Sequence, residues 1–262
     1  MNFFDVVILS IIEGLTEFLP VSSTGHMILV SNLMLLKNTE FLKTFEISIQ
    51  LGAIFAVVVM YRQRLLRSLE IYFKLFVAFL PAAVIGFLAY SSIKSYLFNG
   101  YVVSVALIIG GIILILLDNW TDNRPQEFVD LQKVSYKGAL VIGFFQCLAM
   151  IPGTSRAAAS IFGGIAAGFD RKQATEFSFL LAIPTMMGAT GYDLLKSGGA
   201  LNGNQTGLLI AGGILAFIFA WAAVKVFIKM VVKYGFKHFG YYRIIIGVLF
   251  LILSVWGGLT VS

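Results

Sequence analysis

Two acidic residues stand inside an apolar stretch near the start of the sequence. Glu13 and Glu17 are four residues apart, so both carboxylates lie on one face of a helix. An ionised group at the centre of a bilayer costs at least about 2.5–3.5 kcal/mol even on lenient insertion scales, and such groups usually mark a polar cavity. We therefore expect neither side chain to face lipid. The alternative to a polar site is an ion pair that locks the local structure.

A run of small polar residues follows Pro20 and comprises Ser22, Ser23, Thr24, Gly25 and His26. The apolar segment after this run is typical of a new helix, whose first turn the hydroxyl groups would cap. The free N–H groups and positive dipole end of such a helix form an anion site. Ser23, beside an acceptor and three residues before His26, resembles a nucleophile with its base, whereas capping and packing are the alternative roles.

A second polar segment repeats this pattern and ends in an arginine: Pro152, Gly153, Thr154, Ser155 and Arg156. Arginine offers a planar fork of donors that suits phosphate, and it stays charged where the dielectric constant is low. A salt bridge from Arg156 to Glu13 or Glu17 alone is the other interpretation. If the two segments converge, their helix starts, carboxylates, hydroxyl, imidazole and guanidinium predict a site for a doubly or triply charged phosphate.

The two carboxylates would repel such a phosphate unless a cation neutralised them. A Mg²⁺ or Ca²⁺ ion between Glu13, Glu17 and the phosphate oxygens would do this, so a divalent cation is implied. We favour Ser23 as the nucleophile, with His26 taking its proton and Glu17 orienting His26 or holding the metal. Attack by His26 itself, or by a metal-activated water, stays open.

Composition indicates the kind of structure that positions these groups. Of 262 residues, 59% are hydrophobic and 12% are charged, and the mean hydropathy is +0.91. Soluble domains carry about 25% charged residues. We therefore predict one membrane domain over residues 1–262. The net charge of +6 comes from basic residues in short connections, which favours orientation in a membrane over binding of nucleic acid.

Apolar stretches of two kinds are present, and together they predict an all-α polytopic membrane protein. Six are long enough to cross the bilayer: 41–61, 75–91, 101–118, 174–195, 207–228 and 241–260. Two others, 3–36 and 136–168, are interrupted at their centres by the polar segments. Each half has roughly 15 residues, fewer than the about 20 that a crossing needs, so we expect two re-entrant helical hairpins.

The chain also shows an internal repeat, over about 1–130 and 131–262. Glu13 to Ser23 matches Gln146 to Ser155, and Glu46 to Leu51 matches Glu176 to Leu181. Each half then holds one hairpin and three spans, and an odd number of crossings makes the second half inverted in the membrane.

The positions of the basic residues agree with this topology. If 61–74, 119–140, 168–173 and 225–243 are cytoplasmic, they hold 14 of the 19 Lys and Arg residues. Such a bias is what the positive-inside rule requires. The first hairpin would then enter from outside and the second from the cytoplasm, so that their tips meet near the middle of the membrane.

The two polar segments, residues 13–26 and 152–156, resemble the motifs of the undecaprenyl pyrophosphate phosphatase family of the bacitracin-resistance (BacA) type. The resemblance implies hydrolysis of undecaprenyl pyrophosphate to undecaprenyl phosphate and inorganic phosphate, which recycles the lipid carrier for bacterial cell-wall synthesis. It also implies a site that opens to the outer face of the bacterial plasma (inner) membrane. The family's acidic pair falls on Glu13 and Glu17, its Ser and His on Ser23 and His26, and its phosphate-binding Arg on Arg156.

A secondary transporter or lipid-carrier flippase is the competing function, because inverted repeats with broken helices are typical of transporters. A nucleophile and base beside an anion site favour the enzyme, since transport of a phosphate headgroup would not need them. The sequence leaves open whether two copies form a homodimer.

Overall fold

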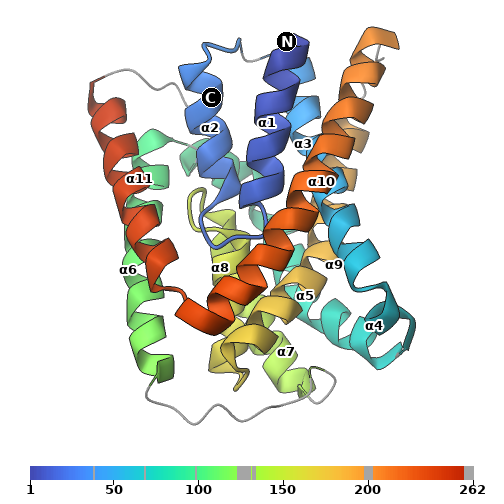
Figure 1. Cartoon of the computed structure of the whole chain (residues 1–262), viewed down its shortest axis with the longest axis vertical. Helices are drawn as coiled ribbons and strands as arrows, with labels where there is room; N and C mark the ends of the chain where they lie inside the picture. Colours follow the sequence, from blue (N-terminus) through green and yellow to red (C-terminus); the bar gives the residue numbers. More distant parts are fainter. Residues whose placement is uncertain are drawn as a thin grey trace.

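The described part of the chain is entirely helical (Figure 1). The computed structural model describes residues 1–37, 39–67, 69–97, 99–122, 131, 134–197 and 203–256. In chain order the elements are α1 (Phe3–Thr16), α2 (Ser23–Leu33), α3 (Glu40–Met60), α4 (Arg62–Arg67), α5 (Leu69–Tyr96), α6 (Gly100–Asp122), α7 (Tyr136–Gln146), the 3₁₀ helix η2 (Cys147–Met150), α8 (Arg156–Ala166), α9 (Arg171–Ser197), α10 (Gly203–Tyr234) and α11 (Lys237–Val255).

Five helices in the described residues are long and apolar enough to cross a membrane: α3, residues 69–89 of α5, residues 100–121 of α6, α10 and α11. They correspond to five of the six predicted spans. The sixth prediction, 174–195, falls in α9, which has 27 residues but is not among these apolar helices. Its polar side chains face the protein interior, because Gln173, Thr175 and Ser178 are all buried.

The outer surface of the helices is apolar. On α10, for example, Ile210, Ile214 and Ile218 recur every four residues, and each is more than half exposed. Repeated apolar side chains at this spacing form a stripe along one side of a helix. Such surfaces would be unfavourable in water, so the protein meets lipid there.

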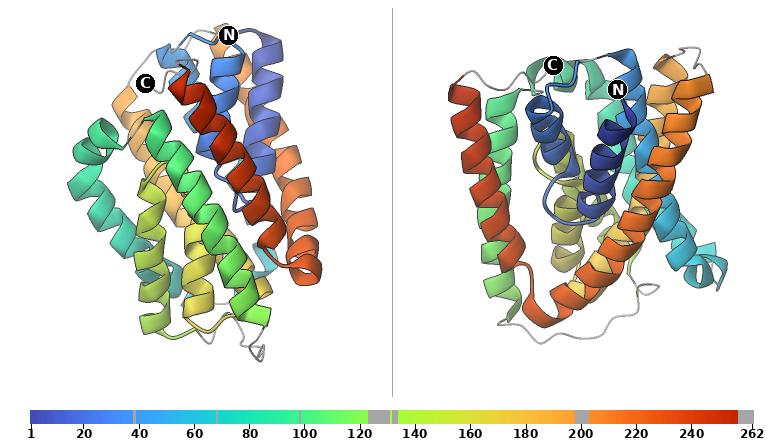
Figure 2. Two further views of the ribbon diagram at one scale, coloured as in Figure 1. Left: turned by 90° about the vertical axis from the view of Figure 1, so that its left-hand side faces the viewer. Right: turned by 45° about the horizontal axis from the view of Figure 1, so that its top comes forward.

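The two helical hairpins approach each other from opposite ends of the molecule (Figures 1 and 2). The first consists of α1 and α2, and the second of α7, η2 and α8, with their connecting loops near the middle. α1 packs against α10 and α7 against α5, while α3 contacts α9 and α6 contacts α11. Each hairpin is thus supported by a long helix of the other half of the chain.

A chain of aromatic contacts ties the first loop to the long helices. Phe18 is fully buried and meets Phe179 of α9 edge to face, with ring centroids 5.5 Å apart. Phe179 lies 6.0 Å from Phe227 of α10, which in turn lies 5.0 Å from Phe239 of α11. Aromatic pairs in these geometries contribute about 0.5–1.5 kcal/mol beyond their buried area.

The described parts of the four basic connections lie at one end of the molecule, opposite the start of α1 and the end of α11 (Figure 1). Arg243 is an exception to the sequence interpretation, which counted it among the cytoplasmic basic residues. Its side chain is fully buried and reaches the loops of both hairpins. The prediction for this residue was wrong, because its polar partners are backbone groups that a charge count does not register.

The close approach of α3 and α10 generates a stability prediction. A Cβ atom on Gly52 would lie 2.2 Å from the carbonyl oxygen of Gly213, whereas one on Gly213 would have no heavy atom within 4 Å. We expect Gly52→Ala to lower the free energy of unfolding by about 1–3 kcal/mol through overpacking. Gly213→Ala should be neutral or stabilising, since alanine favours helix. Thermal unfolding in detergent compares the two, and equal effects would contradict the packing.

Candidate active site

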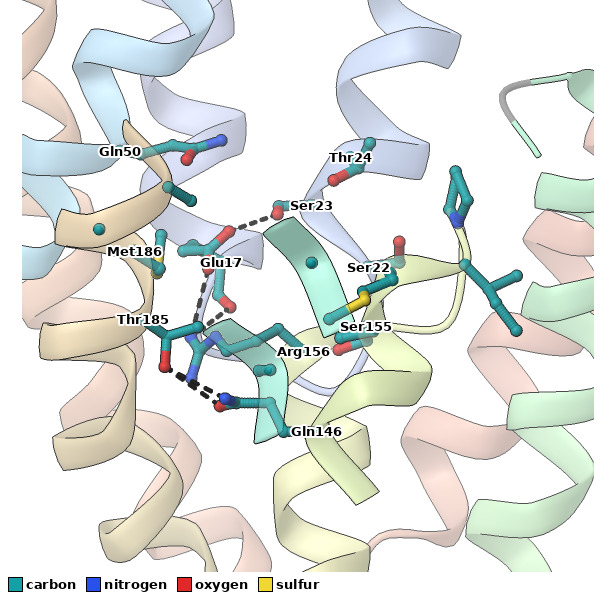
Figure 3. Close-up of a pocket in the computed structure, with 18 of the residues that line it drawn as sticks. Glu17, Ser22, Ser23, Thr24, Gln50, Gln146, Ser155, Arg156, Thr185 and Met186 are labelled. Carbon is teal, nitrogen blue, oxygen red and sulfur yellow. Dashed lines mark hydrogen bonds and ion pairs between the residues drawn. The ribbon is translucent and has the colours of Figure 1, made fainter. Parts of the chain in front are cut away.

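A cavity of about 510 Å³ lies between the two hairpin loops and the second halves of α5 and α9 (Figure 3). Its polar lining consists of Glu17, Ser22, Ser23, Thr24, Gln50, Gln146, Ser155, Arg156 and Thr185. The opposite wall is apolar and includes Phe79, Ala82, Ala83 and Phe87 of α5 with Met186 and Ala189 of α9. One cavity therefore offers both a polar end and an apolar side.

The first loop ends α1 and begins α2 within a few residues. Glu17 directly follows α1, and its N–H donates to the carbonyl oxygen of Glu13. Ser22 has φ of 68°, and its hydroxyl accepts from the N–H of Gly25, so it caps α2. Ser23 is then the first helical residue, which directs its side chain into the cavity beside the free N–H groups of the helix.

The second loop has the same local structure. Ser155 has φ of 73°, and its hydroxyl accepts from the N–H of Ala158, which makes Arg156 the first residue of α8. Gly153 has φ of 93°, and a Cβ atom there would lie 2.5 Å from the carbonyl oxygen of Val103. The strain of a serine backbone at positive φ is on the order of 1–3 kcal/mol, so this conformation persists only where the surrounding structure holds it. Both loops are therefore kept in place by tertiary contacts.

Glu17 joins the functional groups of the two loops. Its Oε2 accepts a hydrogen bond of 2.5 Å from the hydroxyl of Ser23, and its Oε1 lies 3.2 Å from Nη2 of Arg156. Nη1 of Arg156 donates to the carbonyl oxygen of Ser178 on α9. Ser155 adds a direct link between the loops, since its hydroxyl donates to the carbonyl oxygen of Leu19. The predicted convergence of the two polar segments is thus present.

Arg156 keeps donor capacity for an anion. Its guanidinium carbon lies 5.6 Å from the ring centroid of Phe18, in a cation–π contact. Its Nε is buried and has no hydrogen-bond partner among the described residues. A buried donor without a partner is costly, so an anionic ligand that accepted from it would bind favourably. Arg156 therefore forms the ion pair with Glu17 and keeps one donor for a further acceptor, so the ion pair does not use its full donor capacity.

His26 is placed differently from the expectation. Its Nδ1 lies 2.8 Å from the carbonyl oxygen of Ser22, and its Nε2 lies 2.7 Å from the hydroxyl of Tyr242 on α11. The two rings stack, with an interplanar angle of 6°. His26 does not line the cavity, and the acceptor of the Ser23 hydroxyl is Glu17. The structure therefore does not bring His26 to Ser23 as a base.

Other predicted site residues divide into two groups. Ser22, Thr24, Gly153 and Ser155 line the cavity with Glu17, Ser23 and Arg156. Glu13, Gly25 and Thr154 do not line it. Gly25 instead contributes its N–H to the cap of α2, and Thr154 its carbonyl oxygen to Arg243.

Glu13 and Glu17 are the two carboxylates that the sequence suggests as metal ligands. Glu13 is buried, and its Oε1 has no hydrogen-bond partner among the described residues. Groups of three or more metal-binding side chains do not occur in that part of the chain. Mg²⁺ often takes only one or two protein carboxylates and completes its shell with water and substrate phosphate, so Glu13 and Glu17 fit such an ion.

Three polar residues of the cavity escaped the sequence interpretation as site residues. Gln146 is buried, and its Nε2 donates to the hydroxyl of Thr185 at 3.2 Å. Gln50 also lines the cavity (Figure 3). The repeat held a usable signal for Gln146, because it matches Glu13 in the other half. Gln50 falls in the repeated segment Glu46 to Leu51, but its counterpart there is the apolar Leu180, and Thr185 stands in no motif.

Comparison with known proteins reveals close relatives. The protein family described as Bacitracin resistance protein BacA matches residues 6–249. Curated proteins named undecaprenyl-diphosphatase are similar over nearly their whole lengths. The one from Wolinella succinogenes is 51% identical, covering 96% of this chain and 98% of its own. Those from Flavobacterium johnsoniae and Aquifex aeolicus are 50% and 49% identical, with at least 95% of each chain covered.

The contact between His26 and Tyr242 generates the second prediction. Tyr242→Phe keeps the stacked ring but removes the hydroxyl that meets Nε2, so we expect a loss of about 0.5–1.5 kcal/mol in the free energy of unfolding. Tyr241→Phe, at a neighbouring and more exposed position, is the matched control and should change stability little. Thermal unfolding of both variants in detergent measures this. Identical melting temperatures would show that the hydroxyl does not hold His26.

Proposed function

Because the chain belongs to the family of the bacitracin resistance protein BacA, we infer that it is an undecaprenyl-diphosphatase. The enzyme hydrolyses undecaprenyl pyrophosphate to undecaprenyl phosphate and inorganic phosphate. The observation that carries this function is the meeting of Ser23, Glu17 and Arg156 at the polar end of a cavity with an apolar wall. A pyrophosphate and the start of a lipid chain need those two surroundings. Transport, the competing function, receives no support from relatives that are named as phosphatases.

The hydrogen bond from Ser23 to Glu17 supports a covalent mechanism. The Ser23 oxygen attacks the terminal phosphorus, and Oε2 of Glu17 takes the hydroxyl proton. The bond between the terminal phosphorus and the bridging oxygen breaks, Glu17 returns the proton to that oxygen, and undecaprenyl phosphate leaves. Water then attacks the phosphoserine and gives one proton to the ionised Glu17. As the bond from phosphorus to the Ser23 oxygen breaks, Glu17 passes this proton to Ser23, and inorganic phosphate departs. Glu17 thereby takes the base role that the sequence interpretation gave to His26.

Arg156 and the two helix starts stabilise the phosphate charge. The free guanidinium Nε and the N–H groups at the beginnings of α2 and α8 are donors near the reacting phosphate. Substrate oxygens would compete with Glu17 for Arg156, which leaves the carboxylate freer to accept a proton. Mg²⁺ or Ca²⁺ held by Glu13 and Glu17 would, when bound, neutralise further charge on the pyrophosphate.

We extend the proposal to the arrangement in the membrane. It comprises six crossings, with α9 as the sixth, and two re-entrant hairpins related by an inverted repeat. Two observations support the repeat. A serine caps the second helix of each hairpin, and the first helix of each hairpin packs against a long helix of the other half, α1 against α10 and α7 against α5. The basic end of the molecule would lie in the cytoplasm of a bacterial cell. The cavity, lined by the halves of α5 and α9 that lead away from that end, would open to the outer face.

The covalent intermediate gives the test of the function. Purified enzyme is mixed with undecaprenyl pyrophosphate labelled at the terminal phosphate and quenched rapidly. We expect protein-bound phosphate that is stable to acid and labile to base in the wild type and absent in Ser23→Ala. Glu17→Gln should form it at least about 10²-fold more slowly, since the proton acceptor is lost. Glu46→Gln, a carboxylate that accepts from Ser31 instead, is the control. An acid-labile adduct would move the attack to His26, and a complete lack of adduct would indicate attack by water.

The fork of Arg156 gives a separate prediction. Arg156→Lys keeps a positive charge but cannot bind Glu17, Ser178 and phosphate together. We expect kcat to fall on the order of 10²-fold or more, as for loss of a charge-stabilising donor. Arg171→Lys, in a cytoplasmic-end ion pair with Asp118, should retain near-normal turnover. Phosphate-release kinetics in detergent measure both, and near-normal kcat for the Arg156 variant would remove it from the mechanism.

A further inference from the structure

Arg243 lies in the interior of the protein, with its guanidinium between the two hairpin loops. Its side chain is fully buried, and it is the largest such side chain in the described part of the chain. It comes from α11, which packs along α6. None of the ion pairs within the described residues includes it. Its charge is therefore balanced by dipoles rather than by a carboxylate.

All five N–H donors of Arg243 are used, and every acceptor is a backbone carbonyl oxygen. On α6, Nε donates to Leu107 at 3.3 Å and Nη2 to Ala106 at 3.0 Å. In the first loop, Nη1 donates to Pro20 at 2.9 Å. In the second loop, Nη1 donates to Thr154 at 2.8 Å and Nη2 to Gly153 at 2.9 Å.

The loop carbonyl groups that Arg243 binds belong to residues two to three positions before Ser23 and Arg156. Pro20 precedes the cap Ser22 and the nucleophile Ser23, and Thr154 precedes the cap Ser155 and Arg156. A buried backbone carbonyl without a partner is costly, so these bonds stabilise both loops. A single planar group thus sets the position of one loop relative to the other.

Arg243 lacks the properties that binding of a ligand would require. It has no donor left, no exposed surface, and no place in the lining of the cavity. We propose that Arg243 is a positioning residue, which holds the loop of Ser23 and the loop of Arg156 in register for the phosphatase reaction. This role rests on the proposed function, because register matters only if the two loops act on one phosphate.

Gly110 on α6 provides the space for this guanidinium. A Cβ atom there would lie 2.1 Å from Nη2 of Arg243. The pair gives two independent ways to disturb the register. Arg243→Lys keeps the charge but offers three donors on one nitrogen, so it cannot satisfy the five carbonyl groups that the planar guanidinium binds. Gly110→Ala keeps the arginine but displaces it. Gly213→Ala on α10, where the added methyl group meets nothing, is the matched control.

Two measurements on the whole enzyme in detergent test the proposal. Hydrogen exchange followed by mass spectrometry should show faster exchange in both loops, residues 18–26 and 150–158, with α3 and α10 unchanged. In phosphate-release kinetics, Arg243→Lys and Gly110→Ala should each lower kcat by about 10- to 100-fold, as expected for a displacement near 1 Å. Gly213→Ala should show neither change.

A double-mutant cycle separates positioning from a general loss of structure. If Arg243 acts by aligning Arg156, the loss caused by Arg243→Lys should largely disappear in an Arg156→Lys background. Losses in kcat that multiply would overturn the proposal, as would faster exchange in one loop only or unchanged kcat in both variants. If Arg243→Lys does not fold, Gly110→Ala decides by the same criteria. Wild-type enzyme that releases no phosphate would refute the proposed function instead, and the exchange pattern would still report on the register.

Discussion

Backbone N–H and C=O groups that are buried inside a protein need partners there, and the site of this enzyme depends on that constraint. Both hairpin loops leave the helical pattern of hydrogen bonds in the interior of the molecule. Ser22 and Ser155 satisfy N–H groups of the helices that they begin, and Arg243 satisfies three loop carbonyls. With these partners the loops can hold positive φ angles and present polar side chains to the cavity. Without them, buried polar backbone would favour continuous helices.

The residues at the polar end of the cavity could be predicted from the sequence because they belong to local patterns. Carboxylates spaced by four residues, hydroxyl groups at a helix start and an arginine in a first turn are features of short segments. That the segments meet followed from the repeat and from the shortness of the apolar halves. Glu17, Ser23 and Arg156 accordingly share one cavity.

What the sequence interpretation missed depends on residues far apart in the chain. His26 was expected to serve Ser23, its neighbour on α2, but its Nε2 meets Tyr242 on α11. α9 covers the sixth predicted span, but the burial of its polar residues by other helices could not be seen from hydropathy along the sequence. Arg243 was counted as a cytoplasmic charge because its partners are backbone carbonyl groups. Every residue has a carbonyl group, so the amino-acid sequence does not indicate which ones bind an arginine.

The placement of Arg243 in the last described helix has a consequence for biosynthesis. A chain emerges from the ribosome from its N-terminus, so Ser23, the two carboxylates and Arg156 are all made well before α11. The two loops lack their common anchor until that helix has been synthesised and has docked against α6. Catalytic competence is therefore a late event in the life of each molecule, and a chain truncated before α11 would carry every reactive group yet lack the alignment that makes them an enzyme.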